Sequence, residues 1–246
     1  MASQISGFNY QPGMYSRKRP TGSQLAENYF REMDKHLIKE KKEKLAPTEI
    51  PPTICFSRKI GVGALKIADI LAPRIGYNVV DREILEHIAK EEKLNEKTVA
   101  LFDERYSGKL KEFVSFLFAE KSFIKSDYAR YLFNSVVSIA GLSPTIIVGR
   151  GAHLILPRDR VLAVRFICSE TYRINRLVEM LECKPDEARA KLEDSDKEQQ
   201  AFFKKVFGKK DALAYEFDMV INCDFITRPE DAADIVECAF KRKFGL

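Results

Sequence analysis

Residues 54–68, Ile-Cys-Phe-Ser-Arg-Lys-Ile-Gly-Val-Gly-Ala-Leu-Lys-Ile-Ala, decide the fold of this chain. The apolar start of this stretch predicts a buried strand, its glycines predict a tight turn, and its end predicts the first turns of a helix. A helix N-terminus offers unpaired N–H groups and the positive end of the helix dipole, and here Arg58 and Lys59 lie beside it. The stretch therefore predicts a binding place for an anion such as phosphate.

The loop departs from the usual phosphate-loop sequence at the positions that carry the chemistry. That sequence has a glycine, four residues, a second glycine, and then Lys and Ser/Thr. If Gly63 is the second glycine, Arg58 falls on the first, Ala64 on the lysine and Leu65 on the magnesium-binding hydroxyl. The alternative is an ordinary strand-to-helix junction in which Gly61 and Gly63 only permit the turn.

Composition places the chain among ordinary globular proteins. With 246 residues, 45% hydrophobic and 31% charged, it can bury one core, or a core and a small appendage. The five cysteines are odd in number and far apart, which predicts reduced thiols in a cytoplasmic protein. The three histidines have no Cys, Asp or Glu at ligand spacing, so we expect no metal held by side chains. No apolar run approaches about eighteen residues, so neither a membrane span nor a signal peptide is expected.

The formal charge of +5 is concentrated near the N-terminus. Residues 1–50 carry nine Lys/Arg against six Asp/Glu, and the remainder carries thirty-two against thirty. The near balance after residue 50 argues against a nucleic-acid partner. We predict that residues 1–50 form a basic, partly disordered arm with one helix, which begins at a Thr21–Gln24 capping box, and that residues 51–246 form one domain. The arm is expected to pack loosely; the alternative is a helix that binds a partner or clasps a dimer.

From residue 53 the chain alternates strands and helices, as a parallel α/β sheet requires. We predict strands that begin at residue 53 and lie at 77–80, 145–148, 161–168 and 219–223. We predict helices at about 64–75, 83–92, 95–104, 109–120, 126–141, 170–207 (two or three helices) and 229–242. Five short strands with helical excursions after the second and the fourth indicate a nucleotide kinase core with an acceptor-binding insertion and a lid.

Six short motifs in order give a more specific indication. They are Ser57-Arg58 with Gly61-Val62-Gly63 and Ile67-Ala68; Tyr77 with Asp81-Arg82-Glu83; Ile146 to Ala152; Val164-Arg165 with Arg173 and Arg176; Asp196-Lys197-Glu198 with Ala201-Phe202; and Phe217 to Asn222. In these motifs residues 53–243 resemble the cytidylate kinase-like family, which are bacterial relatives of the nucleoside monophosphate kinases. The resemblance implies a P-loop kinase fold, in which helices flank a five-stranded parallel sheet. It also implies ATP, Mg²⁺ and a nucleoside monophosphate such as CMP as ligands.

The resemblance also implies roles for particular residues. The ATP phosphates would be held by Ser57, Arg58, Lys59, Gly61, Val62, Gly63, Ala64 and Leu65. The acceptor would be held by Asp81, Arg82 and Arg150. The negative charge of the transferred phosphoryl group would be neutralised by the catalytic residues Arg58, Lys66, Arg173, Arg176 and Lys197.

Two of the acceptor residues have structural alternatives. Asp81 follows a strand and could instead cap the next helix. Arg150 stands between two glycines and could instead be a surface arginine in a turn. If both serve one acceptor, we expect them to line one cleft; burial of Arg150 in an unrelated salt bridge would make both structural.

The two arginines of the lid region also have a structural alternative. Arg173 and Arg176 are three residues apart, so they could jointly grip a phosphate. Alternatively they form surface salt bridges with Glu170 or Glu179.

Two departures from the family pattern bear on activity. Leu65 and Gln199 stand where relatives carry arginines, next to the phosphates and in the lid. We therefore expect weak or absent turnover even if ATP binds, unless Lys66 or the lid lysines compensate. The alternative is an inactive nucleotide-binding or regulatory protein that keeps the fold. The aromatic clusters at 116–118 and 131–133 are expected in the core or at a homodimer contact.

Overall fold

The computed structural model describes residues 4–5, 8–9, 20–43, 50–105 and 126–246. The predicted helix at 109–120, with its aromatic cluster at 116–118, lies outside the described residues, as does most of the predicted arm before residue 20.

The five strands predicted from the alternating pattern are present and form one sheet. They are β3 (Thr53–Arg58), β4 (Asn78–Asp81), β5 (Thr145–Val148), β6 (Val161–Ile167) and β7 (Met219–Asn222), in the order β4-β5-β3-β6-β7. β4 pairs parallel with β5, and β6 pairs parallel with β7 in a register that sets Ile167 opposite Asn222. A separate antiparallel pair consists of β1 (Gln4–Ile5) and β2 (Phe8–Asn9).

The chain divides into two compact units. The first, which we call the loop unit, contains Phe56–Ile75 and Ala163–Leu246. The second, the helical unit, contains Pro20–Cys55 and Gly76–Leu162.

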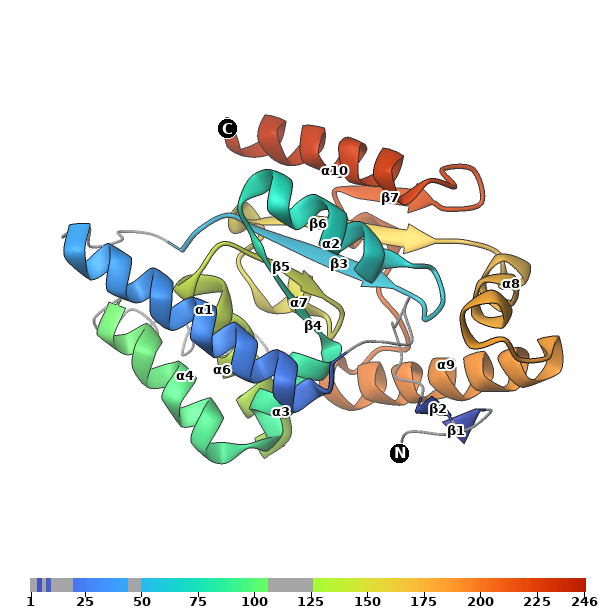
Figure 1. The fold of residues 1–246 in the computed structure, drawn as a ribbon, viewed down its shortest axis with the longest axis horizontal. Helices are drawn as coiled ribbons and strands as arrows, with labels where there is room; N and C mark the ends of the chain where they lie inside the picture. The colour runs from blue at the N-terminus through green and yellow to red at the C-terminus, as the bar shows by residue number, and fades with distance from the viewer. Residues whose placement is uncertain (1–3, 6–7, 10–19, 44–49, 106–125) are drawn as a thin grey trace. The chain divides into compact units, whose positions relative to one another are not determined.

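The loop unit carries α2 (Ala64–Ile75), α8 (Glu170–Leu181), α9 (Pro185–Phe207) and α10 (Pro229–Phe244). α10 lies alongside α2, where Arg74 forms an ion pair with Asp234 (Figure 1). α8 and α9 share an apolar cluster that also receives Ile60 from the turn after β3. The predicted strand-turn-helix therefore has its turn packed against the helices that were predicted to form the lid.

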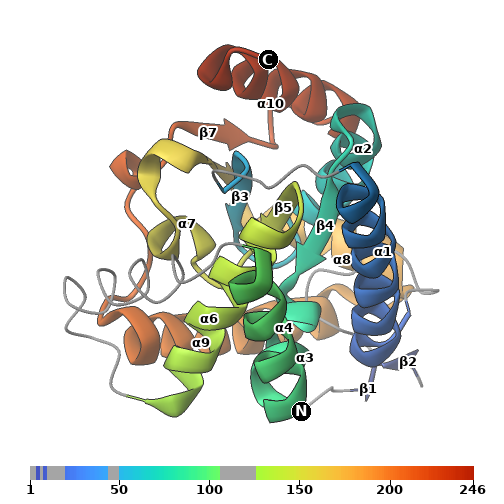
Figure 2. The ribbon, with the colours of Figure 1, turned by 90° about the vertical axis from the view of Figure 1, so that its left-hand side faces the viewer.

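The helical unit carries α1 (Gly22–Glu43), α3 (Arg82–Lys90), α4 (Glu92–Arg105), α6 (Asp127–Leu142) and the short α7 (Ala152–Ile155). α1, α3 and α4 lie side by side, and α6 packs on α3 and α4 (Figure 2). α4 approaches α6 so closely that a Cβ at Gly141 would lie 2.1 Å from the Phe102 ring. Leu132 and Phe133 are buried, so this part of the second aromatic cluster belongs to the core.

Helix α1 begins with the predicted capping box. The N–H of Thr21 donates to Gln24 Oε1 at 3.0 Å, and the N–H of Gln24 donates to Thr21 Oγ1 at 3.3 Å. Tyr29 and Phe30 are buried, and the helix packs on α3, so the expectation of loose packing is wrong for this helix. The domain boundary near residue 50 stays a prediction.

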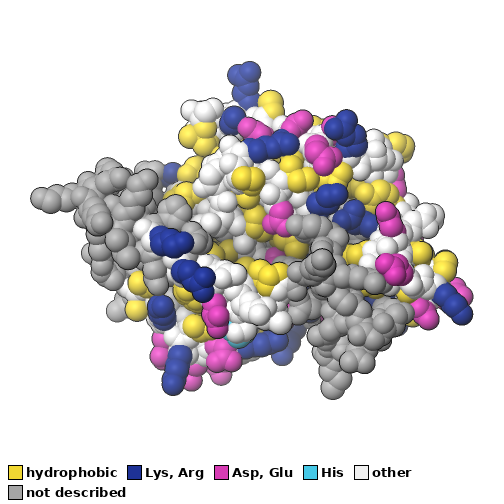
Figure 3. Space-filling view, viewed as in Figure 1, with side chains coloured by type: hydrophobic (Ala, Val, Ile, Leu, Met, Phe, Trp, Pro, Cys, Tyr) yellow, Lys and Arg dark blue, Asp and Glu magenta, His cyan; other side chains and the backbone are white. Residues whose placement is uncertain are grey.

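Charges of both signs are mixed over the molecular surface. The face in Figure 3 shows Lys/Arg and Asp/Glu side chains interspersed, as the near-balanced composition after residue 50 predicts. In the part of the chain that the structure describes, no helix is long and apolar enough to cross a membrane.

Candidate functional site

The loop between β3 and α2 has the tight geometry that its glycines predict. Gly61 and Gly63 have φ of 92° and 90°, in the region that side chains disfavour. A Cβ at Gly61 would also lie 3.2 Å from side-chain atoms of Arg173 and Leu192. Glycine is thus required there both for conformation and for space.

The first turn of α2 leaves backbone donors available. Lys66 and Ile67 donate their N–H groups to Gly63 O, but within the described residues no acceptor is found for the N–H groups of Ala64 and Leu65. The side chains of Val62, Ala64 and Leu65 are buried, so only the backbone of these residues can serve a ligand. This is the arrangement that binds anions at helix N-termini.

Two side chains from α8 and α9 hold the loop by its carbonyl groups. Arg173 Nε donates to Ile60 O at 2.6 Å, and Gln199 Nε2 donates to Arg58 O at 3.2 Å. The other two nitrogens of Arg173 donate to Asp196 at 2.9 and 2.7 Å. Since each nitrogen of its guanidinium donates to a protein oxygen, Arg173 positions the loop.

These contacts bear on two predictions about Arg173. Three of its five N–H groups donate to the loop and to Asp196, and the grip on a phosphate shared with Arg176 stays a prediction. Its carboxylate partner is not one of the predicted residues, since Glu170 pairs instead with Arg189.

Arg176 lies at the loop itself. Its guanidinium carbon is only 2.7 Å from the position that a Cβ on Gly63 would occupy, directly before the first residue of α2. No carboxylate within the described residues pairs with Arg176; its side-chain partner is the hydroxyl of Tyr172. Burial raises the pKa of Tyr172, and the hydrogen bond from Arg176 opposes part of that shift. The loop therefore has one nearby cation without a counter-charge in the described structure.

The other predicted phosphate-binding side chains are dispersed. Ser57 Oγ accepts a hydrogen bond of 2.8 Å from the buried Arg165, whose guanidinium also makes two bonds to Asp211 at 3.1 and 2.7 Å. Ser57 is thereby part of a structural ion cluster. Among the cations, Arg58 is buried, Lys59 is exposed and Lys66 is half-buried. Lys197, predicted to be catalytic, is 74% exposed and reaches Asp194 only at 4.0 Å.

In the helical unit, Asp81 takes the structural alternative. Its Oδ1 accepts the backbone N–H groups of Glu83 at 3.0 Å and Ile84 at 3.1 Å, so it caps α3. The cap places Arg82 at the first position of the helix.

Arg82 and Arg150 meet at a carboxylate that the sequence interpretation missed. Glu86 Oε1 accepts from Arg82 Nε at 2.8 Å and forms an ion pair with Arg150, and Glu86 Oε2 accepts from Lys90 at 3.2 Å. The Arg82–Glu86–Lys90 spacing of four residues was a signal for this cluster, because such residues share a helix face. Arg150 is therefore buried in a salt bridge. The bridge is not an unrelated one, because its carboxylate also holds Arg82, another predicted acceptor residue.

The backbone around Arg150 is unusual. Gly149, Arg150 and Gly151 have φ of 98°, 51° and 67°, three left-handed residues in succession after β5. A non-glycine residue in this region is uncommon and strained, and such strain concentrates at ligand clamps and switches.

The family model described as the cytidylate kinase-like family matches residues 53–224. The chain belongs to the cytidylate kinase-like family. A solved structure of an uncharacterized protein from Eubacterium ventriosum ATCC 27560 shares the fold with a TM-score of 0.59 and 19% identity, over 79% of this chain and 99% of that one. Shikimate kinase from Bacteroides thetaiotaomicron aligns with a TM-score of 0.42 and 13% identity, over 79% of this chain and 98% of that one. None of the curated proteins compared with the chain matches it.

Family membership confirms the predicted fold class, a P-loop kinase fold with a five-stranded parallel sheet flanked by helices. The structure also shows what became of the two positions where the family pattern predicts arginine. Leu65 is buried in the core, and Gln199 uses its amide to hold the loop carbonyl of Arg58. Both side chains therefore make structural contacts at the loop, and neither brings a charge to it.

One usual magnesium contact of a phosphate loop is missing, because the buried Leu65 stands at the position of the hydroxyl ligand. The described residues contain no group of three His, Cys, Asp or Glu side chains at metal-binding distance, but Mg²⁺ in kinases takes most of its ligands from substrate phosphates and water.

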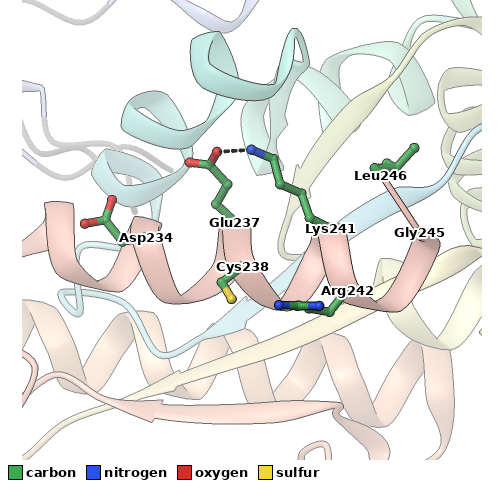
Figure 4. Close-up of a pocket in the computed structure, with 7 residues that line it drawn as sticks. All are labelled: Asp234, Glu237, Cys238, Lys241, Arg242, Gly245 and Leu246. Atoms are coloured by element: carbon green, nitrogen blue, oxygen red, sulfur yellow. Dashed lines mark hydrogen bonds and ion pairs between the residues drawn. The ribbon is translucent and has the colours of Figure 1, made fainter.

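One hollow of the described structure lies along α10. It has a volume of about 630 Å³ and is lined only by Asp234, Glu237, Cys238, Lys241, Arg242, Gly245 and Leu246 (Figure 4). Its Glu237 and Lys241 pair with each other at 2.7 Å. None of the predicted site residues contributes to it.

Proposed function

We propose that this chain binds the phosphates of ATP at residues 61–65 and a nucleoside monophosphate such as CMP at Arg82 and Arg150, and that it transfers the γ-phosphoryl group slowly. The observation that carries the proposal is the position of Arg176, a cation with no carboxylate partner in the described structure, against Gly63 at the start of α2.

The ATP side of the proposal rests on backbone and charge together. The N–H groups of Ala64 and Leu65 would bind phosphate oxygens, and Arg176 would neutralise the negative charge that spreads over the transferred group. An arginine in that role is worth about 10³ to 10⁵ in rate in well-studied phosphoryl-transfer enzymes. Arg176 would thus supply part of the charge that is absent at Leu65 and Gln199. Arg173 and Gln199 would act only by fixing the loop carbonyls.

The acceptor side rests on the convergence of two arginines. Arg82 and Arg150 come from different strand ends and reach one carboxylate, so a single phosphate could contact both. Asp81 would contribute by holding the first turn of α3, and therefore Arg82, in place.

The charge of the transition state would be met by the side chains and backbone of the chain itself. Since the buried Leu65 offers no hydroxyl, Mg²⁺ would be held chiefly by the phosphates of ATP and would add positive charge there. Arg176 and the loop amides would be the protein groups that stabilise the transferred group, and so few contacts are a physical reason for a slow reaction.

A second function is favoured by the same two replacements. With Leu65 buried and Gln199 bonded to the loop, the chain could bind ATP and regulate a partner without transferring phosphate. Binding of ATP is common to both functions, so turnover separates them.

The experiment combines ATP binding by calorimetry with a coupled assay across CMP, dCMP, UMP and AMP. We expect Arg176→Met to weaken ATP binding by about tenfold or more, since it removes a charge-assisted contact. Arg189→Met is the matched control, because Arg189 is a half-exposed arginine of α9 that pairs with Glu170. Equal ATP affinity in Arg176→Met and the unmodified protein would refute the phosphate site. Slow turnover with one monophosphate supports the kinase, none with any supports the regulatory function, and robust turnover would contradict the expected weakness.

A further inference from the structure

Two cysteines stand opposite each other where strands β6 and β7 end. The two strands are parallel neighbours at one edge of the sheet, and their last paired residues are Ile167 and Asn222 (Figure 1). The next residue along each strand is a cysteine, Cys168 after β6 and Cys223 after β7. The N–H of Cys223 donates to Ile167 O at 2.8 Å, so the hydrogen bonding between the strands continues as far as the cysteines. Cys168 and Cys223 are therefore neighbours across the two strands.

The two backbones are also held together just beyond the cysteines. Ser169, the N-cap of α8, donates its N–H and its hydroxyl to the carboxylate of Asp224, each at 2.7 Å. Hydrogen bonds on both sides of Cys168 and Cys223 thus keep their Cα atoms near the strand spacing of about 4.8 Å. A disulfide needs a Cα separation of about 4.4–6.8 Å, which this spacing meets.

The two thiols belong to the same face of the sheet. Side chains alternate along a strand, so Cys168 follows the face of Phe166, and Cys223 follows the face of Ile221. Phe166 and Ile221 are themselves paired across the strands, and both are buried. Cys223 is likewise buried, whereas Cys168 is half-buried. The pair therefore has one thiol that a small reagent can reach and a second, shielded thiol beside it.

Both thiols are protonated at neutral pH. Burial raises the pKa of Cys168 to about 12, with a smaller contribution from the adjacent Cys223, and burial also raises the pKa of Cys223 to about 11. Arg176 opposes both shifts, and Arg173 opposes that of Cys168. The carboxylate of Asp224 adds to both. Because the thiolate is the reacting form, the pair exchanges slowly and stays reduced unless an oxidant persists.

We infer that Cys168 and Cys223 are a modification site, at which a low-molecular-weight disulfide oxidises the two thiols to a reversible protein disulfide. The sulfur of Cys168 attacks one sulfur of the oxidant, forms a mixed disulfide with it, and releases the other half as a thiol. The sulfur of Cys223 then attacks Cys168, the protein S–S bond forms, and the second half of the oxidant leaves. The two thiol protons pass to the two released halves. The protein thereby loses two electrons and the oxidant gains them.

The position of the pair gives the disulfide a consequence for α8. Cys168 directly precedes the N-cap of α8, so the bond ties the start of this helix to the end of β7. α8 carries Arg173, which holds the loop at Ile60 O, and Arg176, which lies against Gly63. A covalent link at the start of α8 opposes local opening of its first turns, and so slows hydrogen exchange of their amides.

The test treats the reduced full chain with dithiodipyridine at pH 8 and maps disulfides by mass spectrometry after digestion without reductant. We expect a peptide that joins Cys168 to Cys223, two pyridinethiols released per link, and loss of the link with dithiothreitol. Cys168→Ser should abolish the link. Cys183→Ser is the matched control and should keep it, because Cys183 is another half-buried thiol, just beyond the end of α8.

Hydrogen exchange shows whether the link belongs to the folded protein. We expect the amides of residues 169–176 to exchange more slowly after oxidation, and faster exchange there would overturn the inference. It is also overturned by a lasting pyridinethiol adduct on Cys168 beside a free Cys223, or by no reaction at Cys168 when Cys183 is fully modified. Links of Cys168 to Cys183 or Cys238 as abundant as the one to Cys223 would overturn it too. None of these measurements involves ATP, so they test the thiol pair independently of the proposed function.

Discussion

Removal of the Asp196 carboxylate should destabilise the protein through Arg173. The Arg173 side chain is 5% exposed and that of Asp196 is 24% exposed, and two hydrogen bonds of 2.9 and 2.7 Å join them. In Asp196→Ala the guanidinium stays buried because it also holds Ile60 O, but it loses its counter-charge. Breaking a buried ion pair costs about 3–5 kcal/mol, and the partial exposure of Asp196 favours the lower end, about 3 kcal/mol.

Thermal and urea unfolding measure this cost. For a chain of this size each kcal/mol shifts Tm by about 2–4 °C, so Asp196→Ala should lower Tm by about 6–12 °C. Asp194→Ala is a close control, because Asp194 lies on the same helix, is 73% exposed, and reaches Lys197 only at 4.0 Å. Both substitutions gain the same helix propensity, so their difference isolates the ion pair. Equal stability of the two variants would refute the positioning role of Arg173 and return it to the candidates for phosphate binding.

Three further outcomes follow from burial. Leu65→Arg, the substitution that would restore the family's loop arginine, should cost more than about 2 kcal/mol in urea unfolding, because it places a charge in the core; an unchanged midpoint would show that the side chain escapes to solvent. Cys238 should react with a maleimide at pH 8 before Cys55 and Cys223, because Cys238 is exposed and the other two thiols are buried. Burial raises the pKa of both buried thiols, to about 11 for Cys223, which lowers their thiolate fraction. Mass spectrometry of the labelled peptides checks the order, and labelling of Cys223 before Cys238 would contradict it. Phe30→Ala should destabilise by about 3 kcal/mol, since Phe30 packs α1 into the helical unit; a loss below about 1 kcal/mol would support the loosely packed arm.

The elements of the fold followed from local patterns. The strand Thr145–Val148 coincides with its predicted range, because an apolar run between two breakers leaves few other boundaries. The capping box at Thr21 likewise fixed the start of α1, since both of its hydrogen bonds are made within four residues. Interactions of short sequence separation can be predicted from spacing alone.

The partners at the loop could not be predicted in this way. Gln199 and Arg58 are 141 positions apart, and Arg173 lies 113 positions from Ile60. The sequence suggested Glu170 or Glu179 as partners for the lid arginines, and the choice of Asp196 depends on how α8 packs on α9. Glu86 is the opposite case, because its four-residue spacing from Arg82 and Lys90 was visible, and only the contact with Arg150 required the fold.

A motif shows only that an arginine is missing at one sequence position, whereas phosphoryl transfer depends on where the charges lie in the folded protein. Leu65 and Gln199 removed two cations from their usual elements, yet a third element, α8, brings Arg176 against Gly63. Arg176 can serve there because Arg173, one turn earlier, takes over the structural contacts with the loop and with Asp196. In the proposed function the two arginines therefore have different roles although they are only three residues apart. Arg173 would fix the loop, and Arg176 would meet the phosphate because no carboxylate in the described structure pairs with it.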